Sequence, residues 1–63
     1  MASEMRFAEV RKRLEGASYH LVRISGSHHI FEKPGSQLLS IPVHHGKVKP
    51  RYVREVQRII EEQ

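Results

Sequence analysis

Two turn signals divide the middle of this chain into short segments and restrict its fold more than any other feature. Gly26-Ser27 and Pro34-Gly35 separate three runs, "YHLVRIS", "HHIFEK" and "QLLSIPV". Runs rich in β-branched and aromatic or aliphatic residues between such turns are typical of strands. Because the connections are short, we expect neighbouring strands to pair as an antiparallel meander. Pro42 should lie near the end of the third strand or on an edge, since proline cannot donate a hydrogen bond to a sheet.

An amphipathic helix is predicted before the strands, in the segment "SEMRFAEVRKRLEG". Phe7, Val10 and Leu14 are spaced so that they form one apolar stripe on such a helix. Ser3 is expected to cap its start, and Gly16 is expected to end it in a left-handed conformation.

A second amphipathic helix is predicted after the strands, in "PRYVREVQRIIEE". Pro50 suits its first turn, and Val53, Val56 and Ile60 form its apolar stripe. The order is therefore α-β-β-β-α. We expect residues 1–63 to form a single α+β domain in which two helices cover one face of a three-stranded antiparallel sheet.

Composition limits the classes of function. The chain has 63 residues, a net charge of +4 and no cysteine, so its core is small and it has neither disulfides nor a cysteine-based zinc site. The isoelectric point is near 10.0, and a small basic domain suggests a polyanionic partner, most often nucleic acid. The sequence shows neither an apolar run long enough for a membrane span nor a secretory signal, and we expect a cytoplasmic protein.

A pair of adjacent histidines follows the first turn signal. A two-residue loop there pairs Ser25 with His28, and an equally short loop at Pro34-Gly35 would place His28 opposite Ile41. A slip of one residue would exchange the faces of the sheet. In either register, His28 lies at the same end of the sheet as the second histidine pair, His44-His45.

Three roles are conceivable for the first pair. Adjacent residues in a strand point to opposite faces, so His28 and His29 cannot easily hold one ion together, and no carboxylate at suitable spacing completes a metal site. We therefore expect no metal and no cofactor. The histidines are then either solvated strand-end residues without a role or proton-transfer catalysts, because imidazole ordinarily titrates near neutral pH.

Basic residues gather before and within the last helix, in "HHGKVKPRYVRE". Lys47, Lys49 and Arg51 precede or open the helix, and Arg51, Arg54 and Arg58 form one stripe along it. Cations at a helix N-terminus oppose the helix dipole. This placement favours a functional cause, namely phosphate binding, over a merely solvated helix face.

Two segments, "SYHLVRISGSHHIF" and "SIPVHHGKVKP", together with the closing helix, resemble the HicA family of bacterial and archaeal toxins. The resemblance rests on Gly-Ser-His before an aromatic strand, followed by Pro-x-His, within the α-β-β-β-α order. It implies a fold similar to the double-stranded RNA-binding domain. It also implies an mRNA interferase, which cleaves RNA without a metal through a histidine of the Gly-Ser-His segment and is inhibited by a HicB-like antitoxin protein.

By this resemblance the catalytic histidine corresponds to His28, or to His29 in members that carry it one position later. We favour His28 as the general base on the ribose 2′-OH. A non-catalytic RNA-binding module of the same fold and a protein that only binds an acidic antitoxin remain the alternatives. The expected RNA-binding residues are Arg23, Ser27, His44, Lys47, Lys49, Arg51 and Arg54.

Overall fold

The computed structural model describes residues 3–62 and confirms the predicted α+β fold in the order α-β-β-β-α. Two very short strands, which the sequence pattern did not predict, accompany it. No helix within residues 3–62 is long and apolar enough to cross a membrane. The elements are β1 (Met5–Arg6), α1 (Phe7–Gly16), β2 (His20–Ser25), β3 (His28–Glu32), β4 (Leu39–Pro42), β5 (Lys47–Val48) and α2 (Pro50–Glu61).

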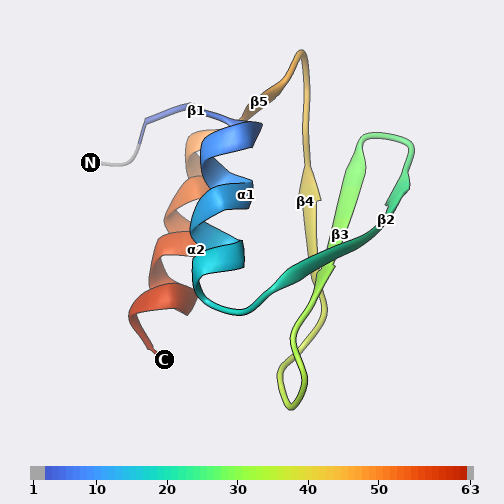
Figure 1. The fold of residues 1–63 in the computed structure, drawn as a ribbon. Coiled ribbons are helices and arrows are strands. Elements are labelled where there is room, and N and C mark those ends of the chain that lie inside the picture. The colour runs from blue at the N-terminus through green and yellow to red at the C-terminus, as the bar shows by residue number, and fades with distance from the viewer. Residues whose placement is uncertain (1–2, 63) are drawn as a thin grey trace.

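Both helices lie on the same face of the three-stranded sheet, whose strand order is β2-β3-β4, and the opposite face is open (Figure 1). The predicted apolar stripes point inward, because burying them removes apolar surface from water. Phe31 of β3 is completely buried at the centre of the sheet. The core also contains Val10, Leu14, Tyr19, Ile41, Val48, Val53 and Val56.

The first helix begins later than predicted. It starts at Phe7 and not near Ser3, because β1 immediately before it is extended and pairs with β5. The backbone N–H of Phe7 donates to the carbonyl of Gly46 at 2.8 Å, which satisfies one of the free donors at the helix start. At the other end, Ser18 and not Gly16 takes the left-handed conformation, with a φ of 72°.

The hairpin between β2 and β3 has the predicted register, with Ser25 opposite His28. Of the two loop residues, Gly26 has a positive φ of 61° and Ser27 does not. Glycine with positive φ at the first loop position is typical of the type II′ turns that suit the twist of a two-residue hairpin.

The predicted register between β3 and β4 was wrong by one residue. His28 lies opposite Pro42, not Ile41. Gly35 has a φ of 80° after Pro34, as in a type II turn, which does not fit a two-residue hairpin. Residues 36–38 therefore pass before β4 begins, and the slip changes which residues share a face with His28.

The segment between β4 and α2 contains a tight hairpin turn. His44 and Lys47 exchange two backbone hydrogen bonds of 3.0 and 2.9 Å. His45 and Gly46 between them have φ values of 54° and 74°, and positive φ at both positions defines a type I′ turn. This turn directs β5 back onto β1 (Figure 1).

Candidate functional site

The two histidines of the first pair lie on opposite faces of the sheet. His29 is half-buried on the helix-covered face, where its ring centroid is 4.4 Å from that of Phe7. Its Nδ1 lies 3.3 Å from the carbonyl oxygen of Ser27 and donates a hydrogen bond there when protonated. His28 is exposed and belongs to the open face. The sheet therefore incorporates one imidazole into its packing and leaves the other accessible.

His28 lies between two strand partners on the open face. Ser25 of β2 and Pro42 of β4 are directly opposite it, and directly opposed residues share a face. Arg23 and Ser40 lie opposite the residue two positions further along β3, and so they occupy the same face. The sheet thus places a guanidinium on the same face as the exposed imidazole.

A hollow of about 380 Å³ adjoins the strand partner of His28. Pro42 lines it, together with His44 from the turn and Lys49 and Arg51 at the start of α2. Pro50 fixes the helix start at this point because its ring holds φ near the helical value. Three of the predicted phosphate-binding residues, His44, Lys49 and Arg51, are therefore gathered at one end of the sheet.

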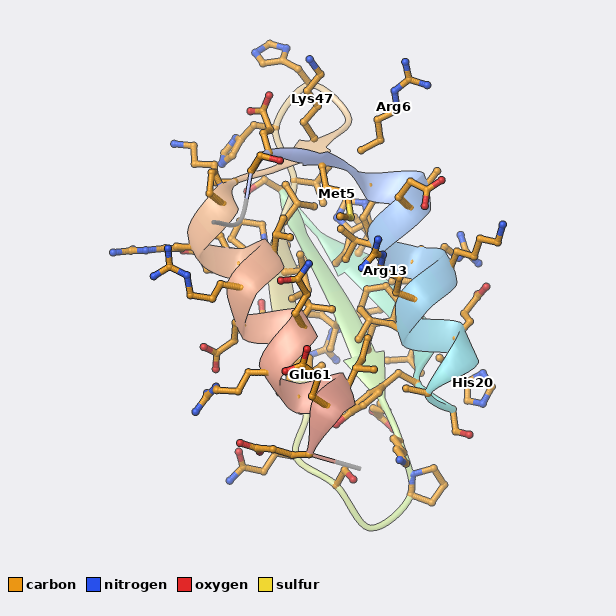
Figure 2. All side chains as sticks on the ribbon, turned by 90° about the vertical axis from the view of Figure 1, so that its left-hand side faces the viewer. Met5, Arg6, Arg13, His20, Lys47 and Glu61 are labelled. Atoms are coloured by element: carbon orange, nitrogen blue, oxygen red, sulfur yellow. The ribbon has the colours of Figure 1, made fainter. Side chains whose placement is uncertain are left out.

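Two further predicted residues lie elsewhere. The Nζ atom of Lys47 is 3.8 Å from Oε1 of Glu4, and Lys47 lies beside Arg6 at the β1–β5 end of the molecule (Figure 2). Arg54 lines a neighbouring, larger groove of about 670 Å³ between β4 and α2. Lys47 does not line the hollow at all, because alternate positions of β5 point in different directions.

Sequence reasoning did not identify Tyr52 as a site residue. Its half-buried side chain lines both the hollow and the groove, and the guanidinium carbon of Arg51 is 5.9 Å from its ring centroid. The adjacent Arg-Tyr pair is a signal in the sequence, but Tyr52 comes directly before Val53 of the apolar stripe, where an aromatic residue is expected to pack. Within residues 3–62, no three histidine, aspartate, glutamate or cysteine side chains lie together as a metal site would require.

The fold and site define a class: a small basic α+β domain with an exposed histidine beside a cationic hollow, which suits a polyanionic ligand. The family described as the HicA toxin of bacterial toxin-antitoxin systems matches residues 7–62. The chain therefore belongs to the HicA toxin family, and membership implies an antitoxin partner in general. Searches of curated proteins and of solved structures gave no match.

Proposed function

We propose that this protein is a metal-independent endoribonuclease toxin that cleaves mRNA in the cytoplasm and is inhibited by a HicB-like antitoxin. One observation carries the proposal. The Gly-Ser-His histidine, His28, is exposed on the open sheet face, and its strand partner Pro42 lines a cationic hollow. The alternative base, His29, packs against Phe7 and would have to leave that contact to reach a ribose.

In the proposed reaction, an unprotonated ring nitrogen of His28 accepts the proton of a ribose 2′-OH. The 2′ oxygen attacks the adjacent phosphorus in line, and the bond from phosphorus to the 5′ oxygen breaks. A protonated His44 in the hollow supplies the proton that the leaving 5′ oxygen needs. The products are a 2′,3′-cyclic phosphate and a 5′-OH end.

Cations stabilise the charge that develops on the phosphorus oxygens during this attack. Lys49 and Arg51 line the hollow, and Arg23 is on the same sheet face as His28. The mechanism requires a 2′-OH, which DNA lacks. RNA is therefore the only nucleic acid that the proposed enzyme cuts.

The test is an RNA cleavage assay in EDTA with the parent chain, His28→Ala and His29→Ala. A matched control is His20→Ala. His20 is exposed and lies opposite Glu32, which is about 13 Å from His28 along β3. His20 also lies away from the end of the molecule that carries Lys47 (Figure 2). We expect His28→Ala to slow cleavage by about 10²–10⁴-fold and His20→Ala to leave it unchanged. Undiminished cleavage by His28→Ala, or cleavage of DNA, would contradict the proposal.

A non-catalytic RNA-binding module is the second candidate, favoured by the exposed basic residues Lys49, Arg51 and Arg54. Binding through phosphate contacts weakens steeply with salt and does not depend on the histidines. Salt-sensitive binding that the parent and both histidine variants share, without cleavage by any of them, would select this candidate.

A further inference from the structure

The hollow beside Pro42 and the groove between β4 and α2 are neighbours. Arg51 and Tyr52 line both of them. Together their lining residues run from His44, at the end of the sheet that carries His28, along the edge of β4 to Arg54 and beyond. We call the hollow and the groove together the β4–α2 track.

Positive charge is concentrated in the part of the track nearest to His28. Lys49, Arg51 and Arg54 are exposed, and none of them forms an ion pair within residues 3–62. Further along, Arg58 is paired with Glu55 at 2.7 Å, and Glu62 lines the far end of the groove. The track thus attracts an anionic chain up to about Arg54 and offers it little net charge beyond.

The edge of β4 is poorly suited to a peptide strand. The N–H of Val43 donates to the carbonyl of Ser27 at 2.7 Å, so by the antiparallel alternation Leu39 and Ile41 bond to β3, whereas Ser40 and Pro42 face outward. Proline has no N–H, and Ser40 is then the one residue of β4 that offers an outward donor. Strand addition by a protein partner would gain few main-chain hydrogen bonds here.

An aromatic side chain lies where the two halves of the track meet. Tyr52 lines both halves, and the guanidinium of Arg51 lies near its ring. Unpaired RNA bases stack on aromatic rings and on arginine planes, whereas the bases of a duplex are already stacked on each other. We infer that the β4–α2 track binds single-stranded RNA on one side of the bond that is cut, with Arg54 holding a phosphate outside the reacting centre.

This inference rests on the proposed ribonuclease function and adds a testable property, a dependence on RNA length. If Arg54 holds a phosphate outside the reacting centre, RNA gains this contact only when the strand is long enough to extend from His28 along the track. The experiment titrates the full chain with fluorescent 2′-O-methyl RNA oligonucleotides of increasing length, which have no free 2′-OH and cannot be cut. Binding is measured by anisotropy at several salt concentrations for the parent, Arg54→Gln and Arg11→Gln.

Arg11→Gln is the matched control, because it removes the same charge from an exposed position on α1. We expect Arg54→Gln to bind the longer oligonucleotides more weakly than the parent does. The slope of log affinity against log salt should fall in magnitude by about 0.7, the value for one phosphate contact on a single strand. The shortest oligonucleotides should bind both variants alike.

Equal losses for Arg54→Gln and Arg11→Gln at every length would overturn the inference, and so would tighter binding of duplex RNA than of single strands. Binding of an acidic peptide that depends on Arg54, with no binding of RNA, would assign the track to a protein partner instead. Failure of the ribonuclease proposal is detected separately, because loss of cleavage in His28→Ala does not depend on the result for Arg54.

Discussion

Adjacent histidines at positions 28 and 29 have different surroundings because of the pleat of one strand. Successive side chains in a strand point to opposite faces, and here one face is covered by helices and the other is open. His29 therefore contacts Phe7, while His28 faces solvent. The helix layer on one face of the sheet thus gives the two neighbouring imidazoles different surroundings.

This difference predicts a difference in stability between the two alanine variants. His29→Ala removes a ring contact with Phe7, and aromatic pairs contribute about 0.5–1.5 kcal/mol beyond their buried area. We expect it to lower the free energy of unfolding by about 1 kcal/mol. His28→Ala, at an exposed position, should change it by no more than about 0.5 kcal/mol. Urea denaturation of the two variants measures both values, and equal losses would mean that His28 is also a packing residue.

At the scale of elements, the sequence predicts what is periodic and local. Both helices and the three longer strands follow from apolar spacing and turn residues, and Pro50 marks the start of α2 as expected. The strands β1 and β5 have two residues each, too few for a period. Their pairing is a non-local contact, and it also moved the start of α1 from Ser3 to Phe7.

The sequence likewise predicted only part of the arrangement of the candidate site. The grouping of His28 with His44 follows from chain order alone, and the register error of one residue did not remove it. The direction of Lys47 was not predictable, because it depends on the type I′ turn and on the ion pair with Glu4. Tyr52 was missed because it lies beside the apolar stripe of α2 and also lines the groove, and the sequence pattern does not distinguish these two positions.

The edge of β4 gives a prediction at the element scale. The backbone groups of Pro42 point away from β3, toward the free edge of the sheet, so replacing this residue costs no hydrogen bond to β3. Pro42→Ala should lower the free energy of unfolding by about 0.4–1 kcal/mol, through the greater freedom of the unfolded chain. It also creates an outward N–H on an edge that proline had blocked, and open edges promote association between chains.

We therefore expect Pro42→Ala to self-associate more than the parent as its concentration rises, measured by sedimentation velocity. Ser40→Ala is the control, since it leaves the backbone donors of the edge unchanged. A loss of several kcal/mol in Pro42→Ala would show instead that the backbone of residue 42 points toward β3, and that Ser40 and Pro42, not Leu39 and Ile41, are the hydrogen-bonded positions of β4.

At the scale of the whole molecule, one small core supports both the sheet and the site. Domains have about 0.05–0.15 kcal/mol of stability per residue, or about 3–9 kcal/mol for a chain of this length. Phe31 has no exposed surface and its ring centroid is 6.1 Å from that of Phe7. Deleting a buried phenylalanine ring costs about 3–5 kcal/mol, which is a large share of the total.

Phe31→Ala should therefore lower the free energy of unfolding by about 3–5 kcal/mol, half or more of the total, and Phe31→Leu, which keeps most of the volume, should lose only about 1 kcal/mol. Ile24→Ala is the control, since Ile24 is 57% exposed and its loss should stay within about 0.5 kcal/mol. Circular dichroism during urea titration measures all three.

RNA cleavage should follow the folded fraction across the series, because Phe31 touches no part of the proposed chemistry. Cleavage lost from a fully folded Phe31→Leu would mean that the core also sets the position of His28.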